Sequence, residues 1–242
     1  QPRNPTPKML GIRSVLLEAK ADKDKANAGY TTPLFIAAEN GQLEVARFLL
    51  GARADMEKAN IFGITPLCVA AQEGQCQVAR LLLEVRADKD NKVDINNRTT
   101  PLFIAAQNGQ LEVARLLLEA RADKDKANIN GTTPLFIAAK KGWLEVVRFL
   151  LEARADKNKA NANETTPLSI AAENGQLSVV RLLLESKADK NKANITGATP
   201  VSIAAQERQL HVMQFFLEEM GMEIPQDRLE LVRLLWAVRE LA

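Results

Sequence analysis

The sequence predicts an all-α protein in which short pairs of helices are stacked one after another. Three observations lead to this prediction. Thr-Pro pairs return at a nearly constant interval, Ala-Asp pairs return at the same interval, and the residues between them carry apolar side chains at helical spacing. A fixed period of this size is typical of repeat proteins, in which each unit buries its apolar face against its neighbours.

The period can be read directly from the positions of the two pairs. The Thr-Pro pairs begin at Thr32, Thr65, Thr100, Thr133, Thr166 and Thr199, so the intervals are 33, 35, 33, 33 and 33 residues. The Ala-Asp pairs begin at Ala21, Ala54, Ala87, Ala122, Ala155 and Ala188, so the intervals are 33, 33, 35, 33 and 33 residues, and the one long interval overlaps that of the Thr-Pro pairs between Asp88 and Thr100. The longer interval places two extra residues between Asp88 and Thr100. We expect these residues in a loop, because lengthening a loop costs little free energy.

The unit that begins at Thr100 shows why each element is expected. Thr100 is a helix-capping residue, and Pro101 suits the first helical position because it lacks an N–H that would go unpaired there. Small and apolar residues follow, and Gly109 predicts the end of this first helix. Apolar residues at 113, 116 and 117 predict a second amphipathic helix. The stretch ADKDKANING that follows at 122–131 has turn residues and no helical period, so it predicts a loop.

The consensus T-P-L-x-I-A-A-x-x-G-x-L-x-V-x-x-L-L-L-x-x-x-A-D resembles the ankyrin repeat, over roughly residues 9 to 220. The style of the stretch ARADKDKAN is also similar to ankyrin arrays of unicellular algae. The resemblance implies a solenoid of helix-turn-helix units with projecting hairpin loops. It also implies a concave face, built from the hairpin tips and the exposed side of the first helices, that binds another protein.

The expected division of the chain follows from how well each stretch matches the repeat. We expect an N-terminal extension at 1–8, a partial repeat at 9–26, five full repeats at 27–193, a degenerate terminal repeat at 194–221 and a C-terminal helix at 222–242. One apolar stripe of the last helix should cap the array. A second patch, which includes Trp236, either is buried as well or contacts a partner.

The sequence departs from the family at positions where glycine is usual. After the second helix stand Lys20, Arg53, Arg86, Arg121, Arg154 and Lys187, and three residues before the prolines stand Tyr30, Arg98 and Glu164. A non-glycine residue with positive φ costs about 1 kcal/mol. These positions therefore predict either a strain that packing offsets or a modified helix cap.

Composition argues against several functions. Lys+Arg is 32 and Asp+Glu is 30, a net charge of +2, and aromatic residues make up 5%, so nothing favours nucleic acid. No apolar run reaches the ~18 residues of a membrane span. The single histidine, His211, and the isolated pair Cys68 and Cys76 offer no catalytic set or zinc site. We expect no enzyme activity, no cofactor, no metal, no small-molecule substrate and no membrane insertion, and we interpret the Asp- and Lys-rich loops as solvated charge ladders.

Two cysteines are too few for a disulfide framework, which favours an intracellular, reducing compartment. The cytoplasm is the default expectation. An organelle stays open as an alternative because the chain begins at Gln1 rather than at Met.

Candidate partner-binding residues follow from the resemblance, position by position. On the first helices they are Glu39, Asn40, Gln72, Glu73, Gln107, Asn108, Lys140, Lys141, Glu173 and Asn174. On the hairpin tips they are Tyr30, Phe62, Asn97, Arg98, Asn130 and Glu164. Trp143 and Trp236 complete the set.

One unit, which reads KKGWLEVV, differs from its siblings at these positions. Lys140, Lys141 and Trp143 replace acidic and amide residues, and an exposed aromatic beside two cations is typical of a binding hot spot. The alternative is neutral drift at a tolerant surface.

The sequence thus favours a protein-protein interaction module that acts as a scaffold or adaptor. One alternative is a permanent structural subunit of a large assembly, with an organelle among the compartments considered. Another is the regulatory ankyrin region of a longer protein whose catalytic part lies outside this chain. The fold does not identify the partner.

Overall fold

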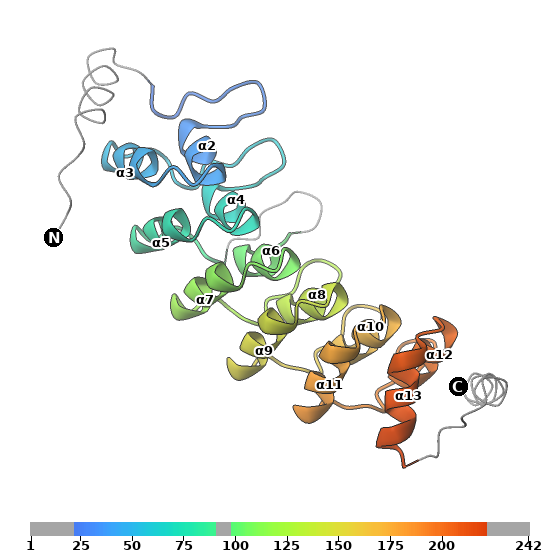
Figure 1. Ribbon diagram of the computed structural model, residues 1–242. Coiled ribbons are helices and arrows are strands. Elements are labelled where there is room, and N and C mark those ends of the chain that lie inside the picture. Colours follow the sequence, from blue (N-terminus) through green and yellow to red (C-terminus); the bar gives the residue numbers. More distant parts are fainter. Residues whose placement is uncertain (1–21, 91–97, 222–242) are drawn as a thin grey trace. The chain divides into compact units, whose positions relative to one another are not determined.

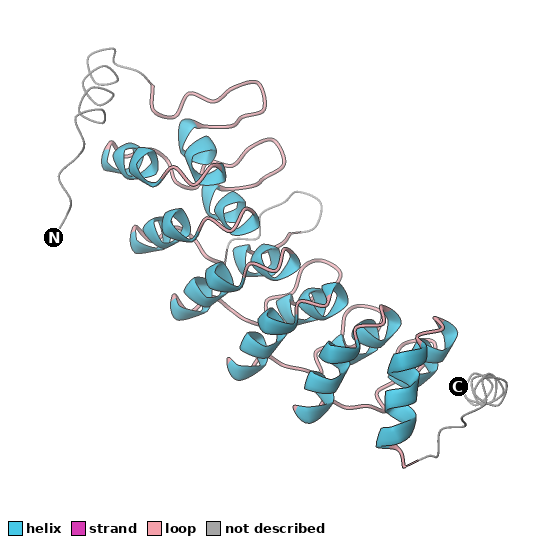
Figure 2. Ribbon diagram, viewed as in Figure 1, coloured by secondary structure: helices cyan, strands magenta, loops and turns pink. Residues whose placement is uncertain are grey.

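The computed structural model describes residues 22–90 and 98–221, and every regular element in these ranges is an α-helix (Figure 2). The chain divides into two compact units, Gln1–Asp88 and Lys89–Ala242. Most of the expected partial repeat, the longer loop at 91–97 with Asn97, and the C-terminal helix with Trp236 lie outside the described residues. The expectations about them, including the place of the two extra residues, remain predictions.

The first unit contains two helix pairs in its described part. The pairs are α2 (Pro33–Glu39) with α3 (Leu43–Gly51), and α4 (Pro66–Gln72) with α5 (Cys76–Glu84). Within each pair the helices pack on each other, and α2 and α3 also contact α4 and α5, respectively (Figure 1).

The second unit contains four further pairs. They are α6 (Pro101–Gln107) with α7 (Leu111–Glu119), α8 (Pro134–Lys141) with α9 (Leu144–Glu152), α10 (Pro167–Glu173) with α11 (Leu177–Glu185), and α12 (Pro200–Gln206) with α13 (Leu210–Glu219). The first helices of the pairs contact one another in sequence, and so do the second helices, so the unit has two parallel rows of helices (Figure 1). This arrangement is the expected all-α solenoid of helix-turn-helix units.

The first helices begin as the sequence predicts. Thr100 Oγ1 accepts the backbone N–H of Phe103 at 3.2 Å, and Thr133 Oγ1 accepts that of Phe136 at the same distance. Pro follows each of these threonines at the first helical position. Because the threonine side chains are buried, these bonds hold the helix start inside the stack.

The core contains the apolar residues that recur with the period. Leu102, Leu135 and Leu168 are fully buried, and the alanine pairs of the first helices let neighbouring helices approach closely. The position that carries Phe103 and Phe136 changes to a buried serine in the last two described repeats. There Ser169 Oγ lies 2.9 Å from Thr166 Oγ1, so the buried hydroxyl is satisfied.

The residues that replace glycine adopt the left-handed conformation. Arg53, Arg86, Arg121, Arg154 and Lys187 have φ between 60° and 67°, and Tyr30, Arg98 and Glu164 have φ between 52° and 57°. The helix caps themselves are unmodified: Arg121 N donates to Leu118 O, and Ala122 N donates to Leu117 O, both at 2.9 Å. Of the two predicted alternatives, the structure therefore shows positive φ with an ordinary cap.

Candidate protein-binding surface

The hairpin that precedes each first helix is closed by an asparagine. Asn128 Oδ1 accepts the N–H groups of Asn130 and Thr132, each at 3.0 Å, and Asn128 N donates to Thr132 O at 3.0 Å. Asn60 and Asn161 make the same set of bonds in their own hairpins. Because the asparagine fixes the backbone, the side chains at the tip are open to variation.

Adjacent tips are joined to each other through the backbone. In the first unit, Ile61 N donates to Gly29 O at 3.2 Å. In the second unit, Ala162 N donates to Asn130 O at 2.9 Å, and Ile195 N donates to Asn163 O at 3.2 Å. We call the tips of each unit, joined in this way, a tip row. The bonds hold neighbouring side chains of a tip row at fixed spacing.

The tip row of the first unit is distinguished by two exposed aromatic residues. In the first unit, Tyr30 is 62% exposed and Phe62 is 58% exposed, and Ile61, whose N–H donates to Gly29 O, is 46% exposed. In the second unit, the predicted tip residues Arg98, Asn130 and Glu164 are exposed and polar. Sequence reasoning missed the exposed isoleucines at 61, 129 and 195. Their signal was an isoleucine directly after an asparagine in a loop that needs no apolar residue.

A second group of predicted residues lies at the far end of α8. The tip row leads into α8 at Thr133, whereas Lys140 and Lys141 stand in the last turn, about 10 Å along the helix axis. Both lysines are exposed. The structure thus separates the predicted residues of this unit into a tip group and a helix-end group.

Lys141 also changes how the helix ends. In sibling helices the equivalent asparagines, Asn40, Asn108 and Asn174, each donate their side-chain amide to a carbonyl of their own helix at 2.9 Å. Lysine lacks that short amide, and α8 is one residue longer, ending at Lys141 with Gly142 as its C-cap at φ of 77°. The asparagine amides are thus engaged within their own repeats, whereas the Lys141 ammonium extends into solvent.

Trp143 combines exposure with a structural contact. Its side chain is 43% exposed, as expected, but Nε1 donates to Gln107 O at 3.0 Å, and the ring lies against Gly109. Gln75 and Gln209 hold the equivalent position and donate to the carbonyls of Glu39 and Glu173 at 3.1 and 3.0 Å. The indole therefore repeats the donor role of the glutamines. Packing against the preceding repeat is therefore a structural role for Trp143 beside the two interpretations offered by the sequence.

The remaining candidates lie along the first helices. Glu39, Gln72, Glu73 and Gln107 are exposed, and Glu173 is half-buried. They occupy the last turns of α2, α4, α6 and α10, the same helix end as Lys140. The exposed residues of neighbouring first helices within a unit therefore form a second line, separate from the tip row.

The Asp- and Lys-rich loops link each repeat to the next. Asp125 Oδ1 accepts the N–H of Asp156 at 2.9 Å, and Lys159 Nζ donates to Asp125 O at 2.7 Å. Asn158 takes the part of Asp125 one repeat further, accepting the N–H of Asp189 at 2.9 Å. Among the described residues, no cluster of His, Cys, Asp or Glu side chains is arranged to hold a metal ion.

Two carboxylates of this ladder have shifted pKa values in opposite directions. Burial alone would raise the pKa of Asp24, but the N–H of Asp55 and the neighbouring Lys23 bring it below its ordinary value. Burial raises the pKa of Glu57, and the negative charges of Asp88 and Asp55 raise it further. The hydrogen bond from the N–H of Asp88 lowers the pKa but does not offset these two effects. Glu57 is the one glutamate at a ladder position whose other described members are Asp or Asn.

None of the helices within 22–90 and 98–221 has the length and apolar character of a membrane span. The fold and its exposed rows define a repeat protein with an extended surface for contact. A family model described as "Ankyrin repeats (3 copies)" matches residues 9–93, 34–128, 87–161 and 155–228, and the chain belongs to this family. A search of curated proteins finds no match. Ankyrin repeats generally bind other proteins and typically do not catalyse reactions.

Proposed function

We propose that this chain is a scaffold or adaptor that binds a partner protein through its tip rows and the exposed ends of its first helices. The buried residues repeat almost without change, whereas the exposed residues at the tips and at 140, 141 and 143 differ between repeats. Folding does not require this variation, because the siblings fold with other residues at the same positions. Selection for a specific partner accounts for it.

The observation that carries the proposal is the exposed apolar group in the tip row of the first unit. Tyr30, Ile61 and Phe62 are each exposed over roughly half of their surface or more, on a backbone fixed by the Ile61–Gly29 bond. Rigid aromatic side chains lose little entropy on binding and are enriched at interface hot spots. Trp143, with Lys140 and Lys141 nearby in sequence, provides a second candidate anchor in the other unit.

The same residues would serve the two alternatives, a permanent structural subunit and a regulatory region of a longer protein. The proposal includes the expected division of the chain into an extension at 1–8, a partial repeat at 9–26, five full repeats at 27–193, a degenerate repeat at 194–221 and a helix at 222–242. A permanent subunit buries a large and mostly apolar interface, so its complex survives high salt, whereas an adaptor exchanges partners. Gel filtration of native extract at low and high salt distinguishes the two.

The test uses variants that restore sibling residues. A partner is first identified by cross-linking the native chain and mass spectrometry, and its affinity is measured by calorimetry. Trp143→Gln should weaken binding by roughly 2 kcal/mol if Trp143 is an anchor. Combining Lys140→Glu with Lys141→Asn, which restores the residues of α2 at the same positions, should reduce association with an acidic partner further.

A second set of variants, Tyr30→Ser with Phe62→Asn, removes the exposed aromatic side chains from the tip row of the first unit and should also weaken binding. These exposed changes should leave thermal unfolding within about 0.5 kcal/mol of the native chain. Full affinity in both sets of variants, with unchanged stability, would refute the proposed surface.

A further inference from the structure

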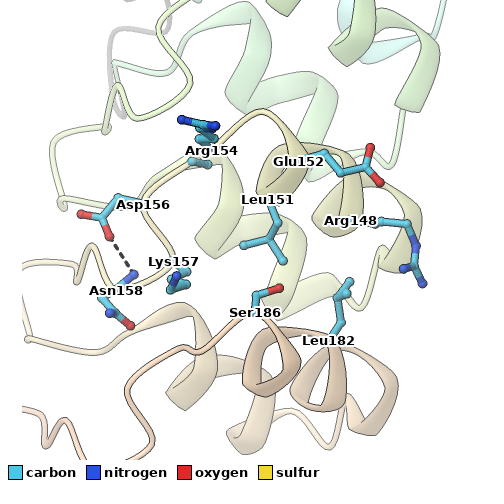
Figure 3. Close-up of a pocket in the computed structure, with 10 residues that line it drawn as sticks. Arg148, Leu151, Glu152, Arg154, Asp156, Lys157, Asn158, Leu182 and Ser186 are labelled. Carbon is cyan, nitrogen blue, oxygen red and sulfur yellow. Dashed lines mark hydrogen bonds between the residues drawn. The ribbon is translucent and has the colours of Figure 1, made fainter.

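A hollow lies away from the tip rows, between the second helices of two neighbouring repeats. Its volume is about 630 Å³, within the range of ligand pockets. The end of α9, the loop that follows it and the facing side of α11 line it (Figure 3). The residues that matter for its chemistry are Arg148, Leu151, Arg154, Lys157, Leu182 and Ser186.

The first reason for the hollow is a missing aromatic ring. In the groove between α7 and α9, the Arg115 guanidinium stacks over the Phe149 ring, 4.4 Å from its centre. Arg181 stacks over Phe215 in the same way at 4.3 Å in the groove between α11 and α13. At the equivalent place in the middle groove, Arg148 meets Leu182, which has no ring to cover. The hollow therefore lacks the aromatic ring that lies under the arginine in each of the two neighbouring grooves.

The second reason is a lysine without its usual carboxylate. Lys23, Lys89 and Lys124 each lie within 4.0 Å of the carboxylate that follows them in sequence, in Asp24, Asp90 and Asp125. Lys157 is followed by Asn158, and no carboxylate of the described residues forms an ion pair with Lys157 or Arg154. The ammonium group of Lys157 is therefore available to an external anion.

A third change adds a donor. Ser186 caps α11 and lines the hollow, whereas Ala120 and Ala153 hold this position at the ends of α7 and α9. Three changes thus occur in the same groove: Leu182 replaces a phenylalanine, Asn158 replaces the aspartate beside Lys157, and Ser186 replaces an alanine. Arg148 keeps one ion pair, with exposed Glu145 at 3.8 Å, which contributes little and yields to a better partner.

The lining also limits what can bind. Three cations face two carboxylates, Glu152 and Asp156, so the local charge is +1, and Asp156 already accepts the N–H of Asn158 at 2.9 Å. A single carboxylate suits this balance better than a phosphate dianion. Figure 3 shows Lys157 and Arg148 on opposite sides of Leu151, which with Leu182 offers an apolar floor.

We propose that this hollow binds an acidic peptide segment of a partner protein, in which a Glu or Asp side chain lies beside an aliphatic one. The carboxylate contacts the Lys157 ammonium and the Ser186 hydroxyl, and the aliphatic side chain packs on Leu151 and Leu182. This site is independent of the tip rows and of Trp143. Its failure and the failure of the proposed function are therefore separate results.

The test measures binding of short peptides to the full chain by amide chemical shifts. The probe is an acetylated and amidated Leu-Gln-Glu-Leu peptide, which carries one carboxylate; the Gln-Gln version and a version with phosphoserine in place of the Glu are the comparisons, each titrated to about 1 mM. The acidic peptide should shift amides in 151–158 and 182–187, and the Gln-Gln version should bind about tenfold more weakly, the effect of one charge-assisted hydrogen bond. Absence of shifts there, or equal affinity of the two peptides, would overturn the proposal. Tenfold tighter binding of the phosphoserine version would instead identify a phosphate site.

Residues at the equivalent positions of other repeats provide substitutions that should close the hollow. Leu182→Phe copies Phe149 and Phe215, so it should fold normally, stack under Arg148 and weaken binding at least about tenfold. Asn158→Asp restores the carboxylate beside Lys157 and should weaken binding about threefold to tenfold. Leu81→Phe makes the same change in α5, away from the hollow, and should leave affinity unaltered. Unchanged affinity in Leu182→Phe would overturn the assignment.

Discussion

Besides the left-handed residue at the hairpin tip, each repeat has one left-handed position after each of its two helices, and these two positions differ in the residue they accept. At the turn between the helices the residue is glycine in five repeats, at Gly41, Gly74, Gly109, Gly142 and Gly175. After the second helix it is Arg53, Arg86, Arg121, Arg154 or Lys187. Because φ lies between 60° and 77° at both positions, backbone conformation alone does not explain the difference.

Crowding by the next repeat explains it. A Cβ on Gly109 would lie 2.7 Å from Cδ2 of Trp143, and a Cβ on Gly41 would collide with the side chain of Gln75. Arg121 and Arg154, by contrast, are exposed. Arg208, also exposed, takes the turn position of the last described repeat with φ of 56°. Glycine is therefore required where a side chain of the next repeat covers the turn. An arginine or lysine is tolerated where the turn is exposed to solvent.

The largest expected effect comes from adding a methyl group at the covered position. Gly109→Ala should lower the free energy of unfolding by about 3 kcal/mol, since left-handed strain and overpacking against Trp143 add together. Urea unfolding of the full chain measures this. Gly51→Ala, in the last turn of α3 with open space around it, serves as the control and should stabilise slightly. If Gly109→Ala lowered the free energy of unfolding by less than about 1 kcal/mol, crowding would not explain why glycine is found at the covered position.

A smaller effect is expected when the covering side chain is removed. Trp143→Ala should destabilise the chain by about 1 to 2 kcal/mol, well below a core aromatic truncation, because 43% of the side chain is exposed. Trp143→Gln should recover most of that loss, because Gln75 and Gln209 make the same hydrogen bond. Thermal melts of the two variants decide the matter. Equal losses for Ala and Gln would show that the indole contributes by packing alone.

The exposed left-handed position should respond in the opposite direction. Arg121→Gly and Arg154→Gly should each raise the free energy of unfolding by about 0.5 kcal/mol, because relief of strain exceeds the extra flexibility of the unfolded chain. Chemical denaturation is the appropriate measurement. A fall in the midpoint for both variants would mean that the arginine side chains contribute more, at the end of their helices, than the strain removes.

The smallest effect depends on pH and belongs to the ladder after the second helices. The raised pKa of Glu57 means that the fold favours its protonated form, a preference lost as pH rises through the folded-state value. Glu57→Gln should therefore stabilise at pH 7 by less than about 0.5 kcal/mol, and this gain should vanish near pH 4. Asp24, whose pKa is lowered, should behave oppositely: Asp24→Asn should destabilise at pH 7 and not at low pH. Unfolding midpoints across this pH range test both, and parallel pH profiles for the two variants would contradict the assignment.

Much of the fold was predictable because its signals are local. A threonine, a proline and an apolar stripe within one repeat determine where helices begin and which side they bury, and the structure confirms these assignments. Positive φ at 121 and 154 was one of the two alternatives that the comparison with the family's glycine predicted, and the structure shows it.

The surface was less predictable because its contacts join residues in different repeats. Trp143 reaches a carbonyl 36 residues earlier, and the hollow depends on Arg148 facing Leu182 rather than a ring. A single repeat contains neither relation. Only a comparison of the same position along the whole array, such as Phe149 with Leu182, brings such differences to light.

Cys68 offers a way to follow motion in the first unit. The side chain is fully buried in α4, and burial raises the pKa of its thiol to about 12. In the closed fold the thiol is buried and protonated at neutral pH, so an alkylating reagent reacts at this site when the repeat opens. The rate at which Cys68 is alkylated therefore measures how often this repeat opens locally, without an attached label.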